Sequence, residues 1–298
     1  MKVLVILGGD SAEREISLKS GTAVGTALSE AGYEVSYCDP LQENILEHIN
    51  DIDVVFPILH GGKGESGDLQ KILEENSVKF VGSGSEASAN CFDKLRTAQL
   101  ASGIVFPKSE VISKDTFENS ELLKNPFVIK PRAEGSSVDT FIVRDPSKFN
   151  YEILETIFPK YNNELLLQEL IEGIEITVPI IGEQAFPVIE IIPPEGKEFD
   201  FVNKYNGETA ENCPPKLVSE LTQKKAQEIA IKLHNLMGCR DISRTDLIVD
   251  KNQNIFCLEI NTLPGMTDNS LVPLSARQAG LTMSQLVDTL VKLALARS

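Results

Sequence analysis

Short apolar runs alternate with an amphipathic stretch in the first part of the chain. The runs at 3–7, 34–38 and 54–58 have the length and composition of buried strands. Between the first two, the pattern at 17–31 predicts a helix that ends at Gly32. This strand–helix–strand rhythm is typical of a doubly wound unit with a parallel sheet, which binds ligands at the carboxyl ends of its strands. The loops that leave those ends carry Gly8-Gly9-Asp10 and His60-Gly61-Gly62.

The pattern changes in the middle of the chain. A short strand at 128–130, a Gly/Ser loop at 133–137 and a strand at 140–143 predict a hairpin whose tip closes over a phosphate chain. Further strands are predicted at 165–170, 175–181, 243–249 and 255–261, and further helices at 220–236 and from Met283. We therefore predict a mixed α/β (α+β) protein with three domains, at 1–92, 93–180 and 181–298.

Composition and charge narrow the class of protein. The formal net charge of −16 argues against nucleic acid as a partner, because the phosphate backbone would be repelled. No apolar run approaches the length of a membrane span, so we expect no membrane association. The five cysteines are scattered without a CxxC pair, which predicts reduced thiols in a cytoplasmic protein and no zinc site.

The hairpin at 243–261 carries the strongest chemical pattern. If Asp250 pairs with Ile255, then Asp246 faces Glu259 across the ladder and Arg244 faces Asn261. All four would share one face, opposite an apolar face formed by Thr245, Leu247, Val249, Leu258 and Ile260. Two opposed carboxylates repel each other unless a hard cation such as Mg²⁺ lies between them. A solvated polar face is the alternative, and the spacing alone does not separate the two.

Three lysines and two loops add weaker signals. Lys94, Lys130 and Lys204 lie where point charges suit phosphates, although an exposed lysine is the simpler interpretation of each one alone. The Gly135-Ser136-Ser137 loop offers backbone N–H groups and hydroxyls to an anion, or is an ordinary turn. Ser270 has the pattern of a helix N-cap, which is either a plain cap or a carboxylate site.

Long motifs then connect these sites to a known family. The following sequence segments carry the resemblance: GGDSAEREISLKSG (8–21), LHGGKGESGDLQ (59–70), VGSGSEASANCFDKLRTAQL (81–100), VIKPRAEGSSV (128–138), EGIEITV (172–178), NKYNGET (203–209), SRTDLIV (243–249) and LEINTLPGMTDNSLVP (258–273). In this order they resemble the D-alanine–D-alanine ligase family of ATP-grasp enzymes, nearly from end to end. The resemblance implies a three-domain ATP-grasp architecture, with ATP held between the two later domains.

The family resemblance also implies a role for each matching residue. Glu13 resembles the carboxylate that holds the ammonium of the first D-alanine, and His60 lies near that substrate. Arg244 resembles the arginine that stabilises the oxyanion. Ser270 and Leu271 match the carboxylate site of the second substrate. For the nucleotide, the resemblance implies phosphate contacts from Lys94, Lys130, Ser136 and Lys204, adenine contacts from Glu169 and Ile171, and a ribose contact from Glu175.

The metal and the mobile loops complete these expectations. Asp246, Glu259 and Asn261 match ligands of Mg²⁺, with Mn²⁺ as an alternative ion and a pair of ions in the site. Glu13, Ser136 and Tyr205 match a hydrogen-bonded triad that forms when the site closes. Two positions depart from the family pattern. Asp139 replaces an expected glycine beside the phosphate loop, and Gln168 replaces an acidic residue near the adenine.

The predicted reaction is the ATP-dependent joining of two D-alanines through an acyl phosphate, for peptidoglycan precursor synthesis. The alternative within the superfamily uses another D-amino acid or a D-hydroxy acid as second substrate. A non-catalytic nucleotide-binding module would be expected to lose Arg244 or the metal ligands, which this chain keeps. A nicotinamide dehydrogenase lacks support, because Gly8-Gly9-Asp10 does not fit GxGxxG. The sequence leaves the oligomeric state open, with a homodimer as one alternative.

Overall fold

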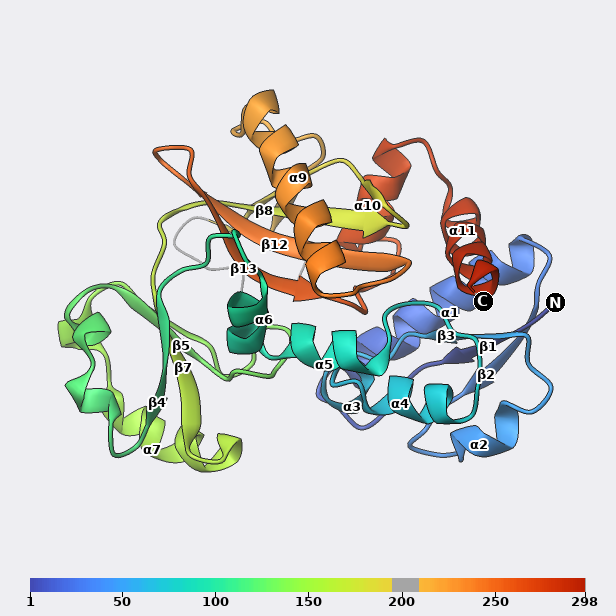
Figure 1. Cartoon of the computed structure of the whole chain (residues 1–298), viewed down its shortest axis with the longest axis horizontal. Coiled ribbons are helices and arrows are strands. Elements are labelled where there is room, and N and C mark those ends of the chain that lie inside the picture. The colour runs from blue at the N-terminus through green and yellow to red at the C-terminus, as the bar shows by residue number, and fades with distance from the viewer. Residues whose placement is uncertain (195–208, 298) are drawn as a thin grey trace.

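The N-terminal region is built on three parallel strands in the order β2-β1-β3 (Figure 1). They are β1 (Lys2–Ile6), β2 (Glu34–Cys38) and β3 (Val54–Pro57). The computed structural model describes residues 1–194 and 209–297. In β1, every residue after Lys2 is buried, as the apolar run predicts. The parallel register, with Val3 opposite Val35 on one side and Val54 on the other, confirms the predicted parallel sheet.

Helices cover this sheet and connect it to the end of the chain. They are α1 (Arg14–Glu30), α2 (Ile45–His48), α3 (Gly62–Glu65), α4 (Asp68–Glu75) and α5 (Ser85–Phe92). Helix α1 begins at Arg14 and not at 17, because the Glu13 carbonyl already accepts hydrogen bonds from the backbone N–H groups of Ile16 and Ser17. The C-terminal helix α11 (Met283–Ala296) packs beside α1 (Figure 1). The Tyr33 hydroxyl donates to Asp288 at 2.8 Å across that contact.

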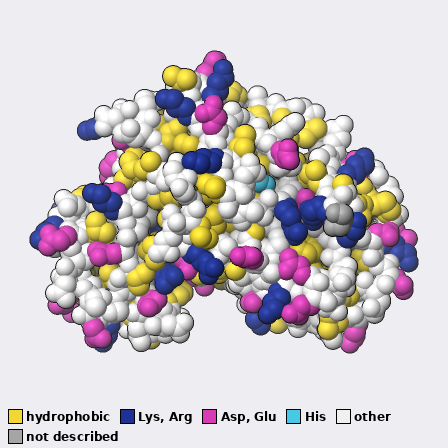
Figure 2. Space-filling view, in the orientation of Figure 1, with side chains coloured by type: hydrophobic (Ala, Val, Ile, Leu, Met, Phe, Trp, Pro, Cys, Tyr) yellow, Lys and Arg dark blue, Asp and Glu magenta, His cyan; other side chains and the backbone are white. Residues whose placement is uncertain are grey.

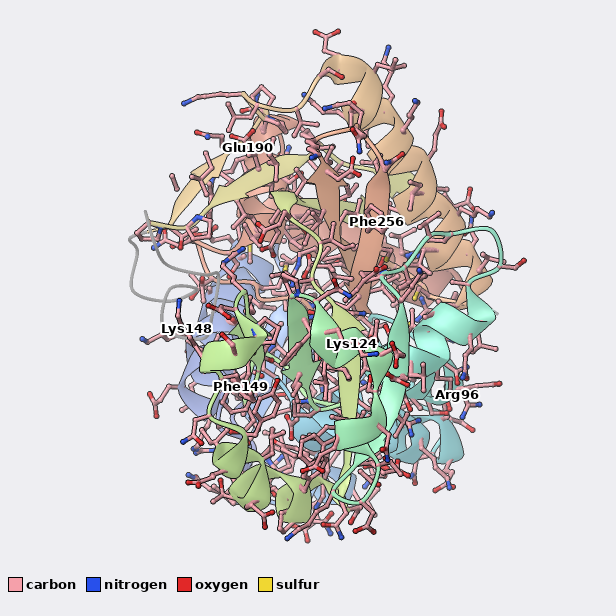
Figure 3. All side chains as sticks on the ribbon, turned by 90° about the vertical axis from the view of Figure 1, so that its left-hand side faces the viewer. Arg96, Lys124, Lys148, Phe149, Glu190 and Phe256 are labelled. Carbon is pink, nitrogen blue, oxygen red and sulfur yellow. The ribbon has the colours of Figure 1, made fainter. Side chains whose placement is uncertain are left out.

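The central region has an antiparallel sheet in the order β4-β7-β5-β6. Its strands are β4 (Ser109–Ser113), β5 (Phe127–Lys130), β6 (Phe141–Val143) and β7 (Glu164–Glu169). Helix α6 (Lys94–Leu100) leads into this sheet. One side of the sheet is covered by α7 (Leu154–Ile157) and by five 3-10 turns, which are η1 (Phe117–Asn119), η2 (Glu121–Lys124), η3 (Pro146–Lys148), η4 (Tyr151–Ile153) and η5 (Phe158–Tyr161). The core is aromatic, and Phe149 is one of its members (Figure 3). Its ring lies edge-on to the rings of Phe127 and Tyr151, with centroids 5.8 and 4.9 Å away.

The third sheet has the order β11-β10-β8-β12-β13, with β9 paired to β8. Its strands are β8 (Gly173–Ile181), β9 (Gln184–Ala185), β10 (Ile189–Ile192), β11 (Ala210–Asn212), β12 (Ile242–Asp250) and β13 (Ile255–Asn261). Helices α9 (Glu220–Leu236) and α10 (Leu271–Gln278) accompany it. Strand β8, which we expected in the central region, pairs along its whole length with β12. The domain boundaries at 92 and 180 stay predictions.

The register of the β12–β13 hairpin corrects one detail of the sequence analysis. Asp246 lies opposite Glu259 and Arg244 opposite Asn261, as predicted, but Val249 and not Asp250 pairs with Ile255. The register shifts between Asp246 and Leu247, so the hairpin contains a bulge. Asp250 instead accepts two backbone N–H groups within the turn. Because of the bulge, Cys257 is buried in the core, and Leu258 borders a cavity on the polar face.

On the face seen in Figure 2, basic and acidic side chains are interspersed. The five cysteines are free thiols, and the Cys91 and Cys239 sulfurs form a hydrogen-bonded contact at 3.6 Å. Within residues 1–194 and 209–297, no helix is both long and apolar enough to cross a membrane.

Candidate active site

Two adjoining cavities have volumes of about 850 and 370 Å³. Residues of the N-terminal, central and C-terminal regions line the larger one, and residues of the central and C-terminal regions line the smaller one. Lys94, Glu134, Gly135 and Glu259 border both of them. The larger cavity is also lined by the predicted residues Glu13, His60, Ser136, Arg244, Asn261, Ser270 and Leu271. The smaller one is also lined by the predicted residues Lys130, Glu169, Ile171, Glu175 and Asp246. The fold thus brings together all the described residues to which the sequence analysis gave a role in substrate, nucleotide or metal binding.

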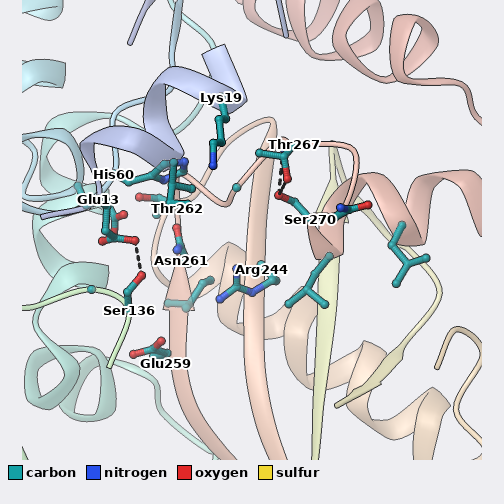
Figure 4. Close-up of a pocket in the computed structure, with 18 of the residues that line it drawn as sticks. Glu13, Lys19, His60, Ser136, Arg244, Glu259, Asn261, Thr262, Thr267 and Ser270 are labelled. Atoms are coloured by element: carbon teal, nitrogen blue, oxygen red, sulfur yellow. Dashed lines mark hydrogen bonds between the residues drawn. The ribbon is translucent and has the colours of Figure 1, made fainter. Parts of the chain in front are cut away.

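Glu13 connects the N-terminal region to the Gly/Ser loop of the central region. It lies at the start of α1 and is 6% exposed. The Ser136 hydroxyl donates a hydrogen bond to its carboxylate (Figure 4). The ideal Cβ position on Gly135 is only 2.8 Å from the same carboxylate, so a larger residue at 135 would displace it.

His60 and Glu65 border the same part of the larger cavity. Burial lowers the pKa of His60, although the Glu13 carboxylate acts in the opposite direction, so the imidazole is neutral. Burial raises the pKa of Glu65 to about 7, and the nearby Glu13 adds to this. The Gly61 N–H donates to Glu65 at 2.9 Å. The segment 60–65 therefore offers the neutral imidazole of His60 and the carboxyl group of Glu65, whose pKa of about 7 lies near neutral pH.

The polar face of the β12–β13 hairpin crosses the floor between the cavities. Arg244 donates two hydrogen bonds to Asp246, at 2.9 and 2.7 Å, and the Thr177 hydroxyl donates a third at 2.5 Å. The Lys94 ammonium lies 3.1 Å from Glu259. The oxygen-rich donor set, on opposed strands, suits a hard divalent cation. Arg244 and Lys94 offset the repulsion between the two carboxylates that the sequence analysis anticipated.

The residues that the sequence predicts to contact the nucleotide come from strand ends and from one helix start. Lys130, at the end of β5, is 8% exposed. Asp93 caps α6 by accepting from the backbone N–H groups of Leu95 and Arg96, which fixes Lys94 at the first position of the helix. The Lys94 ammonium also donates to the Glu134 carbonyl at 2.7 Å. Glu169 closes β7, where its carboxylate accepts from the Lys108 N–H at 2.7 Å.

Ser270 occupies the N-cap position of α10, as predicted, but its hydroxyl does not cap the helix. It accepts from the Thr267 N–H at 3.0 Å and bonds the Thr267 hydroxyl at 2.8 Å (Figure 4). Leu271 follows it at the first helical position. The helix N-terminus thus opens into the larger cavity with two hydroxyls beside it.

The sequence of this chain matches known protein families and relatives along most of its length. A family described as "D-ala D-ala ligase C-terminus" matches residues 101–292, and one described as "D-ala D-ala ligase N-terminus" matches residues 39–83. The chain is 41% identical to a D-alanine–D-alanine ligase of Syntrophobacter fumaroxidans, over 99% of its length and 98% of that protein. The chain belongs to the D-alanine–D-alanine ligase family.

Solved structures agree with this membership. A D-alanine–D-alanine ligase of Bacillus anthracis complexed with ATP is 30% identical, with a TM-score of 0.85 over 99% of this chain and 97% of that one. The VanG D-Ala:D-Ser ligase of Enterococcus faecalis is 27% identical, with a TM-score of 0.81 over 98% and 99% of the two chains. The predicted ATP-grasp fold is thereby confirmed.

Both departures from the family pattern of the ligases have defined partners. Asp139 accepts hydrogen bonds from the Tyr161 hydroxyl at 2.8 Å and from the Lys160 ammonium at 3.2 Å. Gln168 donates to the Ser109 hydroxyl at 2.9 Å. Lys204 and Tyr205, predicted in the phosphate site and in the triad, lie outside the described residues.

Several groups near the cavities of this ligase-family chain were not predicted from the sequence. Glu65 gave no signal, because its pKa depends on burial and on a carboxylate 52 positions earlier in the sequence. Lys19 and Thr267 also line the larger cavity (Figure 4). Lys19 falls on the cavity side of α1, which helical periodicity from Glu13 and Ile16 could have indicated.

A separate group of side chains lies at the end of β2. Cys38, Glu43 and His48 each bring one ligand-type atom within 4.8 Å of the others. This grouping was not predicted from the sequence, from which we expected no zinc site, because the loop between β2 and α2 brings the three residues together. Burial and the nearby Glu43 raise the pKa of the Cys38 thiol to about 11, so the sulfur is protonated near neutral pH.

Proposed function

We propose that this protein joins two molecules of D-alanine to D-alanyl-D-alanine with ATP as the energy source. The observation that carries the proposal is that the predicted nucleotide residues and the predicted amino-acid residues border two cavities that meet at Lys94 and Glu259. A carboxylate on one side and a terminal phosphate on the other can therefore approach each other. The high identity to proteins named D-alanine–D-alanine ligase favours D-alanine on both sides.

The chemistry requires an activated carboxylate, because carboxylate oxygen is a poor leaving group. ATP phosphorylates the first D-alanine to an acyl phosphate, the second amine attacks its carbonyl carbon, and phosphate leaves. Glu13 would hold the first ammonium, with neutral His60 beside it. Ser270 and Leu271, at the N-terminus of α10, would receive the second carboxylate. Arg244, 13% exposed in its side chain, would face the oxyanion.

The nucleotide would lie in the smaller cavity. Lys94 and Lys130 would contact phosphates, with Ser136 and its neighbours above them. Glu169, Ile171 and Glu175 would border the base and ribose. The roles of Lys204 and Tyr205 remain predictions from the sequence.

Asp246, Glu259 and Asn261 would hold Mg²⁺, and their hard oxygen donors fit that ion. Mg²⁺ would supply charge neutralisation on the polyphosphate. Lys94 forms an ion pair with Glu259, and Arg244 forms one with Asp246. With Mg²⁺ bound to the two carboxylates, both cations would contact substrate instead. The free thiols support a reducing compartment such as the cytoplasm, and the cell-wall role follows from the proposed product.

Product analysis by mass spectrometry tests the proposal. The protein is incubated with ATP and Mg²⁺ and with D-alanine alone, then with added D-serine or D-lactate, and phosphate release is followed in parallel. We expect D-alanyl-D-alanine as the main product, and no product from L-alanine. Glu13→Gln should lose this activity, whereas Glu228→Gln, an exposed change on α9, should keep it. A dipeptide with D-serine or an ester with D-lactate as the main product would overturn the substrate assignment.

A further inference from the structure

The loop between β5 and β6 has a costly backbone conformation. Ser136, Ser137 and Asp139 have φ values of +48°, +58° and +49°, in the left-handed region. Such values are uncommon for residues other than glycine, and they persist where surrounding contacts determine the conformation. Aspartate tolerates this region better than most residues. The loop therefore needs contacts that hold it in place.

At its first end, the loop is fastened to α1 and α6. The Lys94 ammonium donates to the Glu134 carbonyl at 2.7 Å, and the Lys94 backbone N–H donates to the Arg132 carbonyl at 2.9 Å. The Ser136 hydroxyl then donates to Glu13. These contacts place Gly135 and Ser137 at the wall of the smaller cavity.

At its other end, the side chain of Asp139 fastens the loop to the turn η5. Its neighbours Val138 and Thr140 line the smaller cavity, whereas Asp139 is not among the described residues that line it. Its carboxylate accepts from the Tyr161 hydroxyl at 2.8 Å, with Lys160 at 3.2 Å. Tyr161 packs in the apolar cluster of the central region, which makes it the firmer partner, whereas the Lys160 side chain is 54% exposed.

We propose that Asp139 is a positioning residue that holds the nucleotide-facing loop through the Tyr161 hydroxyl. Its carboxylate bonds Tyr161 and not the proposed phosphate site, and this contact helps to fix a loop that has only one glycine. The assignment of the cavity to ATP rests on the proposed function, but the anchor itself does not. Tyr161→Phe should therefore loosen the loop even without nucleotide.

The matched control is Tyr151→Phe. Tyr151 belongs to the same aromatic cluster, but its hydroxyl donates to the Pro146 carbonyl at 3.4 Å, away from the loop. Both changes remove one oxygen from a partly buried ring. Asp139→Asn keeps an acceptor for the tyrosine and tolerates the left-handed backbone. Asp139→Gly relieves the backbone cost but removes the anchor.

Two measurements test the anchor. Hydrogen exchange of segment 134–140 in the ligand-free protein should become roughly tenfold faster in Tyr161→Phe and Asp139→Gly, with exchange in β5 unchanged. The KM for ATP should rise by roughly the same factor, with kcat changed much less, because the loop is held before chemistry begins. Asp139→Asn keeps an acceptor for the Tyr161 hydroxyl, so in both measurements it should stay close to the wild-type protein. The double variant Asp139→Gly/Tyr161→Phe should be no worse than either single one.

The opposite results would overturn the proposal. If Tyr161→Phe behaved like Tyr151→Phe in both measurements, the hydrogen bond would not hold the loop. If Asp139→Gly slowed exchange or bound ATP more tightly, Asp139 would destabilise the loop and would not hold it in place. Faster exchange in a protein that makes no dipeptide would leave the anchor standing and refute the proposed function alone.

Discussion

Replacing Glu65 by glutamine is expected to stabilise the ligand-free protein above neutral pH and to change its stability little in acid. The pKa of Glu65 is raised from 4.5 to about 7, mainly by burial. The folded state therefore favours the protonated form. The contribution of this group to stability is fully present below about pH 4.5 and is lost as the pH rises through about 7.

The size of the effect follows from the two pKa values. Each pH unit over which only the folded state holds the proton is worth about 1.4 kcal/mol, so the loss approaches about 3 kcal/mol by pH 8. Glutamine has no charge to bury, and its side-chain oxygen can still accept from the Gly61 N–H. The difference in unfolding free energy, variant minus wild type, should thus grow by about 3 kcal/mol between pH 4.5 and pH 8.

Urea unfolding at a series of pH values measures this difference directly. A chelator and the absence of nucleotide are needed, because cations near Glu13 and Glu259 would favour ionised Glu65. Burial lowers the pKa of His234 to about 4, which makes the wild type lose stability in acid. That effect is common to both proteins and cancels in the difference. Glu228→Gln, on an exposed face, is the control. Parallel stability curves for wild type and Glu65→Gln would refute the argument.

Two further changes are expected to act on the metal site and on the fold. Glu259→Gln should lower ligase activity by roughly a hundredfold or more and abolish the rise in melting temperature that Mg²⁺ gives in the presence of ATP, since one of the proposed carboxylate ligands is lost; retained activity would exclude Glu259 as a ligand. Gly67→Ala should destabilise the protein by about 2–4 kcal/mol, because its φ is +93° and a Cβ would lie 2.3 Å from the Ser85 carbonyl oxygen. Gly32→Ala, at φ +90° with nothing within 4 Å, should cost only about 1 kcal/mol in thermal unfolding, and equal losses would contradict the steric argument.

Alternation along two strands was enough to predict the floor of the site. It placed Asp246 opposite Glu259 and Arg244 opposite Asn261, because residues two apart share a face. It could not predict the bulge after Asp246, since an inserted residue leaves the apolar pattern of each strand nearly intact. Leu258 was therefore assigned to the core, and Cys257 takes that place.

Contacts between distant segments were beyond the sequence pattern. The pairing of β8 with β12 depends on which strand finds which partner, and periodicity carries no such information. The sequence left Ser270 as either a plain helix cap or a carboxylate site, and it gave no sign that Thr267, three residues earlier, bonds the Ser270 hydroxyl. The outward direction of Asp139 likewise depends on Tyr161, which lies 22 positions further along the chain.

The distribution of apolar clusters gives a physical reason for the proposed loop anchor. Residues of α1 and of α11 share a single buried cluster, so the N-terminal and C-terminal regions form a common apolar core. The central sheet has a cluster of its own, drawn entirely from the central region. Two polar contacts at the larger cavity join segments of the chain that are far apart, from Ser136 to Glu13 and from Lys94 to Glu259. Strand residues form much of the wall of the smaller cavity, whereas the loop at 134–140 on the same wall is fixed by hydrogen bonds. The proposed anchor, Asp139, connects that loop through Tyr161 to the aromatic cluster of the central region, and in this way would transfer the rigidity of the cluster to the wall of the smaller cavity.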